Sequence, residues 1–354
     1  MLAALFLAAL PCACLGKTPY FDMTRYNDFS EFETYVRDVA RLNPDIVQLR
    51  LIGHSWEKRP LLGLKISKPN AANSTKPAVW LDGGNHAREW PAFHVAVYFI
   101  EQLVNNYGVD AKITKYIELL DIYVFPVLNP DGFVYSRSST RAMIRHWRKN
   151  RAPVNCSGDS MFKKDVCCEG VDLNRNYDMA FSQENAPFNN PCSDEFQGAI
   201  PFSEPESRAV RDFIMSKEVY GQLYALVSLH THGQMWILPY NHHKNTYPED
   251  YRDLERLAKK AAEKLFSYRE TKYQIGTAVD MLGLPATGGA TDWIKKNTPT
   301  KYVYVLELPP DMSSWFAFQI RPHWLIHIGK ETWMAIQVIM DQVIQETILQ
   351  KQHN

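Results

Sequence analysis

The most restrictive feature of the sequence is a short segment that joins a predicted buried strand to a predicted helix. Residues 77–81 form an apolar run typical of a strand covered on both faces, and residues 91–100 predict a largely buried helix. Between them, the pair Gly83-Gly84 allows a sharp turn, so His86 and Glu89 lie at the strand-to-helix junction. Ligand sites in open α/β sheets are built at such junctions. The segment therefore predicts an α/β fold with a site at this point.

An imidazole and a carboxylate three residues apart can bind one side of a zinc ion and leave the rest of its coordination shell free. A third ligand must then come from elsewhere, and His230 is the candidate because it follows the apolar run 223–229. If the two strands are parallel neighbours, their ends meet at one edge of the sheet. His86, Glu89 and His230 are therefore predicted to bind one catalytic zinc ion per chain. The alternative for a lone histidine is a hydrogen-bonded core or turn residue. We give that interpretation to His54, His94 and His327.

A zinc hydrolase also needs a base to accept a proton from the attacking water. Glu307 is the candidate because it interrupts the apolar run 303–308, where burying a carboxylate is costly unless it has a partner or a function. The alternative is a salt bridge on an edge strand.

Composition agrees with a globular α/β protein. The chain has 354 residues, of which 45% are hydrophobic and 22% charged, enough for a sizeable core. Its formal net charge of zero gives no reason to expect nucleic acid or an anionic membrane as a partner. Predicted strands alternate with predicted helices, without an internal repeat or a linker, so one domain is expected. The strands are expected at 46–52, 61–66, 77–81, 121–128, 223–229 and 302–308, and the helices at 28–42, 91–105, 113–119, 251–268 and 331–349. Residues 129–132 carry a strong turn signal, and residues 136–200 lack regular periodicity.

The first 16 residues predict a secretory signal peptide, because the apolar run is too short to span a membrane and small residues follow it. The run lacks the usual preceding Lys or Arg, and the alternative is a buried N-terminal helix. No later apolar run is long enough to cross a membrane, so we expect a secreted, soluble mature chain at residues 17–354. Asn73 and Asn155 lie in glycosylation acceptor patterns.

Four of the six cysteines lie outside the predicted signal peptide, in one loop-rich region: Cys156, Cys167, Cys168 and Cys192. In an oxidising compartment an even set predicts two disulfides, with three connectivities open. A four-thiolate zinc site is the alternative, but the adjacent pair lacks the usual gap between ligands.

Five motifs together resemble the zinc metallocarboxypeptidases of the carboxypeptidase A/B type. They run in that family's order, and the resemblance extends from about residue 26 to residue 340. The motifs are HAREW at 86–90, LNPDG at 128–132, GVDLNRN at 170–176, GGATDW at 288–293 and LEL at 306–308. The resemblance implies a mixed, mostly parallel, twisted sheet flanked by helices. This family is itself the standard example of a catalytic zinc held by two histidines and one glutamate, so the ligand spacing is not independent support.

The resemblance implies a role for each matching residue. His86, Glu89 and His230 resemble the zinc ligands, Glu307 the general base, and Arg148 the cation that stabilises the oxyanion. The pair Asn174-Arg175 resembles the clamp on the substrate's terminal carboxylate, which makes such enzymes exopeptidases. Further substrate-contacting cations are expected at Arg88 and Arg145, whereas Lys149 and Arg151 are assigned to a solvated basic patch. The family's common bridge falls on Cys168–Cys192, which leaves Cys156–Cys167 as a second, local bridge.

The sequence departs from the family at several positions. Leu284 and His232 stand where the family has tyrosines, and both are assigned to the substrate site. Leu284 cannot donate a hydrogen bond to the substrate, and the alternative for His232 is binding of a stray metal ion. Thr291 stands at the floor of the specificity pocket, which Val279, Asn241, Ile237 and Val305 would also line. A pocket without a charged floor favours apolar or aromatic C-terminal residues.

These residues are compatible with three functions. The first is a secreted, monomeric zinc exopeptidase acting on peptide or protein C-termini. The family's pro-segment has no counterpart here, so the chain is expected either to be made active or to be held by a separate proteinaceous inhibitor. The second is a catalytically weak or silent relative that binds zinc or peptide C-termini, which Leu284 motivates. The third is a metal-dependent amidase acting on small molecules, which would leave the Asn174-Arg175 clamp idle.

Overall fold

The computed structural model describes residues 18–69, 75–159, 164–182, 186–315 and 317–353. The predicted signal peptide and the acceptor site at Asn73 lie outside these residues.

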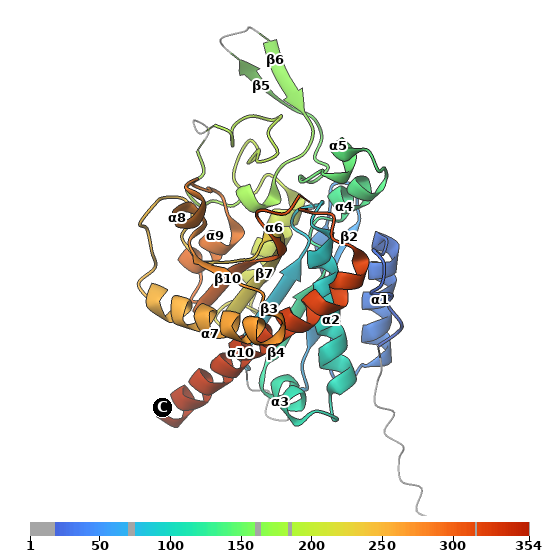
Figure 1. Cartoon of the computed structure of the whole chain (residues 1–354), viewed down its shortest axis with the longest axis vertical. Helices are drawn as coiled ribbons and strands as arrows, with labels where there is room; N and C mark the ends of the chain where they lie inside the picture. The colour runs from blue at the N-terminus through green and yellow to red at the C-terminus, as the bar shows by residue number, and fades with distance from the viewer. Residues whose placement is uncertain (1–17, 70–74, 160–163, 183–185, 316, 354) are drawn as a thin grey trace, which may run out of the picture.

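An eight-stranded sheet forms the centre of the molecule, in the order β1-β2-β4-β3-β7-β10-β8-β9 (Figure 1). The four central strands β4, β3, β7 and β10 run parallel, while β1, β2 and β8 pair antiparallel with a neighbour. The expected mixed, mostly parallel α/β fold is confirmed. The strands are β1 Val47–His54, β2 Pro60–Ile66, β3 Ala78–Gly83, β4 Asp121–Phe125, β7 Leu223–Gly233, β8 Met235–Ile237, β9 Gln274–Gly276 and β10 Tyr302–Asp311, with β5 Asn155–Asp159 and β6 Lys164–Cys168 in a separate hairpin.

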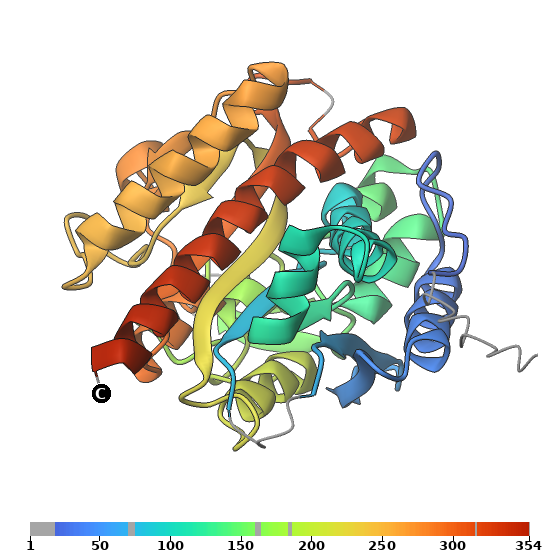
Figure 2. The same ribbon diagram turned by 90° about the horizontal axis from the view of Figure 1, so that it is seen from below.

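Helices cover both faces of the sheet. On one face, side chains of α1, α2, α3, α7 and α10 join a single hydrophobic cluster, and α7 and α10 lie side by side (Figure 2). On the other face, α6 and α9 pack against a second cluster. Strand β3 shows why both faces are buried, because Val79 belongs to the first cluster and Trp80 to the second. The helices are α1 Phe29–Leu42, α2 Trp90–Asn106, α3 Ala111–Leu119, α4 Pro130–Arg137, α5 Ala142–Arg145, α6 Pro205–Ile214, α7 Tyr251–Arg269, α8 Ala278–Leu282, α9 Ala290–Asn297 and α10 Leu325–His353, with short 3₁₀ turns η1 Leu173–Arg175 and η2 Pro322–Trp324.

The predicted turn at 129–132 is wrong, because these residues begin helix α4. The Asn129 side chain caps the helix by accepting a hydrogen bond from Gly132 N at 3.0 Å, and Pro130 occupies the first turn. Asn and Pro favour turns and helix starts alike, so the local signal did not separate the two. The region 136–200 is less irregular than expected, since it contains the end of α4, helix α5, the β5–β6 hairpin and η1.

Strands β7 and β10 extend further than their predicted apolar runs, to Gly233 and Asp311. β7 continues through His230 to Gly233, because it remains paired with β10 as far as this point. His230 therefore lies inside the strand rather than just beyond it. β10 lies between β7 and β8, with Glu307 opposite both His230 and Met235, so the alternative of an edge-strand salt bridge for Glu307 is wrong.

Both disulfides form with the pairing that the family resemblance implied. Cys156 and Cys167 face each other across the β5–β6 hairpin, with an S–S distance of 2.06 Å. Cys168 is bonded to Cys192 with an S–S distance of 2.03 Å, which ties the hairpin to the loop before α6. Within the described residues, none of the helices combines the length and apolarity needed to cross a membrane.

Candidate active site

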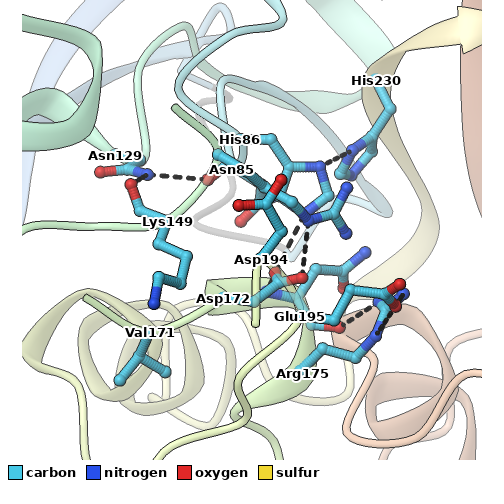
Figure 3. A network of polar contacts seen from close by, with 12 residues as sticks. Asn85, His86, Asn129, Lys149, Val171, Asp172, Arg175, Asp194, Glu195 and His230 are labelled. Carbon is cyan, nitrogen blue, oxygen red and sulfur yellow. Dashed lines mark hydrogen bonds and ion pairs between the residues drawn. The ribbon is translucent and has the colours of Figure 1, made fainter. Parts of the chain in front are cut away.

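The glycine turn after β3 places the first two candidate ligands. Gly84 has a φ of +76°, and a Cβ atom there would meet the Phe93 ring at 2.1 Å, so only glycine fits. The Asn129 amide nitrogen donates to the carbonyl oxygens of Asn85 and Lys149, each at 3.1 Å (Figure 3). This side chain therefore fixes the turn against two other segments. Glu89 follows as the N-cap residue of α2.

The three predicted metal ligands converge in one buried group. His86 Nδ1 lies 2.8 Å from Glu89 Oε1, and His230 Nδ1 lies 3.0 Å from Glu89 Oε2. The two Nδ1 atoms are 3.1 Å apart. One ligand atom from each residue lies within 4.8 Å of the others, so a single ion can contact all three. The register explains this convergence, because Gly83 of β3 pairs with Leu229 of β7, immediately before His230.

The second ring nitrogen of each histidine faces an outer partner that the sequence analysis did not identify. His86 Nε2 lies 3.0 Å from Asp172 Oδ1 (Figure 3), and His230 Nε2 lies 3.4 Å from Ser228 Oγ. Ser228 in turn donates to Asp82 Oδ1 at 2.6 Å. Such partners fix the tautomer and orientation of metal-binding histidines. The position of Asp172 inside the GVDLNRN motif could have indicated a role in the site. No sequence motif pointed to Ser228 or Asp82.

The charges in this group support binding of a divalent cation. Burial opposes ionisation of Glu89, but the facing imidazoles of His86 and His230 hold its pKa well below the usual range. Burial likewise opposes ionisation of Asp172, yet Arg148 and His86 keep the pKa of that carboxyl well below its usual range. Two imidazoles, one ionised carboxylate and correctly placed outer partners are a donor set that fits zinc.

Glu307 points into the same site without a bonding partner. Its Oε2 atom is buried and forms no hydrogen bond with the described residues. Burial, followed by repulsion from the Glu89 carboxylate, raises the pKa of Glu307 to about 8. Buried polar atoms rarely remain unpaired unless they serve a ligand or a reaction. The unpaired oxygen of Glu307 is therefore available to a ligand or a water molecule in the cavity.

A cavity of about 360 Å³ opens over this group and collects most of the predicted site residues. Its lining includes His86, Glu89, Arg148, Asn174, Arg175, His232, Asn241, Leu284, Thr291 and Glu307. Arg148 is held by Asp172, whose Oδ2 accepts from Arg148 Nε at 2.8 Å. The Asn174 Oδ1 atom accepts from Ala290 N at 2.9 Å, so the Asn174 amide nitrogen remains available to a ligand.

A carboxylate that the sequence analysis missed lies against the predicted clamp. Glu195 Oε2 accepts hydrogen bonds from Arg175 Nη2 at 2.6 Å and from Arg175 Nε at 3.2 Å (Figure 3). Arg175 Nη1 donates to the Asn174 carbonyl oxygen at 3.0 Å. These contacts use three of the five N–H donors of the guanidinium, and two remain for a ligand. The position of Glu195 on the loop after Cys192 gave no sequence signal for this contact.

The predicted specificity pocket combines uncharged side chains with one hydrogen-bonded carboxylate. Thr291 is buried, and Ile237, Ala278 and Val305 line the same cavity. Asp292 also reaches this lining, but its carboxylate accepts hydrogen bonds from Asn241 N at 2.5 Å and from Asn241 Nδ2 at 2.8 Å. Both carboxylate oxygens of Asp292 are therefore hydrogen-bonded to Asn241.

Three predicted substrate residues lie outside the described lining of this cavity: Arg88, Arg145 and Val279. Arg88 pairs with Asp194 at 2.8 Å, and the buried Arg145 guanidinium donates to the Arg88 carbonyl oxygen at 3.0 Å. Leu284 lines the rim and is 73% exposed.

The predicted solvated patch at Lys149 and Arg151 is wrong. Lys149 is buried and donates to the Pro191 carbonyl oxygen at 2.7 Å. Arg151 stacks on Tyr135, with 3.9 Å between the guanidinium carbon and the ring centroid, and pairs with Glu169 at 2.6 Å. Aromatic side chains next to these cations made burial favourable. Among the histidines assigned to structural roles, His94 is fully buried, accepts from Asn27 N at 3.0 Å and bonds the Trp90 carbonyl oxygen at 2.8 Å.

Comparison with known proteins places the chain among peptidases. The sequence pattern of a family described as zinc carboxypeptidase matches residues 32–335. Carboxypeptidase A2 of Rattus norvegicus is 34% identical over 323 residues, covering 91% of this chain and 71% of the rat protein. Carboxypeptidase B of Astacus astacus is 31% identical over 322 residues, covering 91% of this chain and 98% of that protein. Bovine thrombin-activatable fibrinolysis inhibitor in complex with tick carboxypeptidase inhibitor gives a TM-score of 0.78 at 28% identity, covering 92% of this chain and 99% of that one.

Proposed function

The chain belongs to the zinc carboxypeptidase family, and from this premise we propose that it removes neutral apolar or aromatic residues from peptide C-termini. The observation that carries the proposal is the convergence, in one cavity, of a metal-binding group, an unpartnered buried carboxylate and a guanidinium clamp. As a metallocarboxypeptidase, the protein is a hydrolase that cleaves the C-terminal peptide bond.

We assign His86, Glu89 and His230 to one zinc ion per chain. Bound zinc acts as a Lewis acid and lowers the pKa of a water molecule towards about 7. Glu307 accepts the proton of the attacking water, since its carboxylate lines the cavity and has an oxygen without a partner. It then returns the proton to the leaving amine. Arg148 faces the negative charge that develops on the scissile carbonyl oxygen, and Asp172 holds its guanidinium in place.

The clamp explains why the C-terminal bond is chosen. The Arg175 guanidinium retains two N–H donors, and the Asn174 amide nitrogen adds further donors, so a terminal carboxylate can bind both. The small-molecule amidase hypothesis would leave these donors without a function. His232 and Leu284 contact the substrate at the rim, and Arg88 and Arg145 act indirectly by supporting the cavity wall.

The neutral pocket sets the preference for the terminal side chain. Thr291 at its floor has no charge, and the carboxylate of the neighbouring Asp292 is hydrogen-bonded to Asn241. An apolar or aromatic side chain gains from desolvation in such a pocket, whereas Lys, Arg, Asp or Glu would lose solvation without an ionic partner.

Two disulfides support a secreted, extracellular protein, because such bonds persist in oxidising compartments. Glycosylation at Asn155 belongs to the same proposal. The solved bovine relative is bound to a tick carboxypeptidase inhibitor, and we extend inhibition by a small protein to this chain.

A silent relative that only binds peptide C-termini is the second candidate. Leu284 favours it, because this exposed apolar side chain at the rim offers no hydroxyl to a bound peptide. The unpartnered Glu307 oxygen favours catalysis, since a binding module gains nothing from it.

The test is release of the last residue from blocked dipeptides that end in Phe, Leu, Lys or Glu, with and without a zinc chelator. Zinc-dependent release should be fastest for Phe and Leu. The matched variant Thr291→Asp places a carboxylate at the pocket floor and should shift preference towards Lys. Zinc-dependent binding without release of any residue would establish the silent relative instead. Fastest release of Lys or Glu by the wild type would show that the pocket is misassigned.

A further inference from the structure

A second cavity, about 720 Å³ in volume, lies away from the metal group. It is formed by the end of α7, the segment after β10 and the start of α10, and Figure 2 shows the two helices side by side. Its charged and aromatic lining consists of Arg269, Arg321, His323, Trp324, His327 and Glu331.

The arginines of this second cavity lack carboxylate partners. Within the described residues, neither Arg269 nor Arg321 forms an ion pair. In contrast, Arg148 and Arg175 of the catalytic cavity are paired with Asp172 and Glu195. The described lining holds two guanidinium groups and one carboxylate, Glu331, so this cavity carries a local excess of positive charge.

The pKa values of His327 and Glu331, which both line the cavity, are consistent with this excess of positive charge. The pKa of His327 is lowered, first by burial and then by the nearby charges of Arg269, Lys330 and His323. Glu331 is the single carboxylate among the described lining residues, and Thr271 Oγ1 donates to it at 2.8 Å. Burial raises the pKa of Glu331 to about 7, so it supplies only part of a negative charge near neutral pH.

Trp324 holds one of the cations in a fixed position. The Arg269 guanidinium carbon lies 4.3 Å from the centroid of the Trp324 ring. Stacking immobilises the guanidinium plane while its N–H donors remain at the edge, the arrangement that suits a carboxylate. Arg321 on the facing segment offers a second guanidinium to the same space.

The two cavities share one wall. Met312 and Phe318 line the catalytic cavity, whereas Pro310, Ser314 and Gln319 of the same segment line the second. When the last residue of a polypeptide occupies the catalytic cavity, its upstream residues must pass over the rim. The clamp and the pocket enclose only the C-terminal end.

We propose that the second cavity binds acidic residues located upstream of the C-terminus in polypeptide substrates, and so acts as an exosite for substrates with an acidic tail. This inference rests on the proposed carboxypeptidase activity and names a substrate class for it. Carboxylates are the matching chemistry because the lining offers two unpaired guanidinium groups and two imidazoles.

The test compares peptides that share one C-terminal dipeptide and carry either four Glu or four Gln residues at graded distances upstream. At one spacing or more, KM for the acidic peptide should be about tenfold lower than for its neutral partner, with equal kcat, and high salt should remove the difference. The double variant Arg269→Gln/Arg321→Gln should lose this preference while hydrolysing a blocked dipeptide at the wild-type rate. Lys260→Gln is the matched control, because it removes one exposed positive charge from α7 away from the cavity.

Equal KM values for acidic and neutral peptides at every spacing would overturn the proposal, as would a preference that survives in the double variant. Fluorescence anisotropy of the labelled peptides on the Glu307→Gln protein separates this outcome from failure of the proposed function. Selective binding of the acidic peptide to this variant, together with no dipeptide hydrolysis by the wild type, would support the exosite and reject the enzyme. Binding of dextran sulfate without binding of the acidic peptide would show that the occupant is misassigned.

Discussion

Replacing Asp172 with Asn should damage metal binding and catalysis together. One carboxylate oxygen of Asp172 lies 3.0 Å from His86 Nε2, and the other accepts from Arg148 Nε at 2.8 Å. Both partners present N–H groups to Asp172 when His86 binds metal through Nδ1. An asparagine supplies one oxygen and one NH₂ group, so it can accept from only one of them. At the other contact, the NH₂ group of the asparagine then faces an N–H donor.

The size of the effect follows from the two contacts. Loss of the outer partner of a metal-binding histidine lowers metal affinity by about 10- to 100-fold. Removing one partner of a buried ion pair costs about 3–5 kcal/mol. Here the cost should be nearer about 2–3 kcal/mol, since the Arg148 side chain is 13% exposed and also interacts with Glu89 and Glu195. With the oxyanion cation misplaced as well, kcat should fall by about 100-fold or more.

Three measurements on one preparation test this prediction: zinc affinity by chelator competition, kcat on a blocked dipeptide, and unfolding free energy in urea. Asp194→Asn is the matched control, because Asp194 pairs with Arg88 beside the same site but is 60% exposed. The control should change unfolding free energy by less than about 0.5 kcal/mol and zinc affinity by less than about threefold. Wild-type zinc affinity and kcat in Asp172→Asn would refute the reasoning.

Two further variants probe single contacts. Burial lowers the pKa of His94 to about 3, so the unfolded chain takes up its proton first and stability falls as the pH drops below about 6.5. From pH 7 to pH 5 the wild type should lose about 2 kcal/mol more unfolding free energy than His94→Gln, and equal slopes in urea titrations would contradict this. Glu195→Gln keeps an acceptor for Arg175 but removes a negative charge beside the clamp, so KM for peptides should fall about threefold with kcat unchanged. A higher KM would mean that Glu195 orients Arg175 rather than competing with the substrate.

The parts of the site that the sequence predicted share a local signature. His86 and Glu89 follow a glycine turn at the end of a strand, and Glu307 interrupts an apolar run, so each stands out from its neighbours. The sheet register then placed all three beside His230, because β3 and β10 are both parallel neighbours of β7. The segment at Asn129 shows the limit of such signals, because Asn and Pro begin turns and helices alike.

The missed residues act through contacts that local sequence does not encode. Asp172 meets His86 across a separation of 86 residues, and Ser228 meets Asp82 across 146. Lys149 was expected in solvent because it lies among other cations, yet the Pro191 carbonyl oxygen and neighbouring aromatic rings accommodate it in the interior. Only the folded arrangement shows which of several charged residues is buried.

The most direct test of the central claim is a zinc titration of the metal-free protein, following release of Phe from a blocked dipeptide. If His86, Glu89 and His230 hold one catalytic zinc ion, activity should rise to a plateau at one equivalent. Glu307→Gln should bind the same single equivalent and release Phe at least about 100-fold more slowly, since it cannot accept the proton. A wild-type protein that binds one zinc ion and releases no Phe would contradict the claim, and so would a Glu307→Gln protein with wild-type activity.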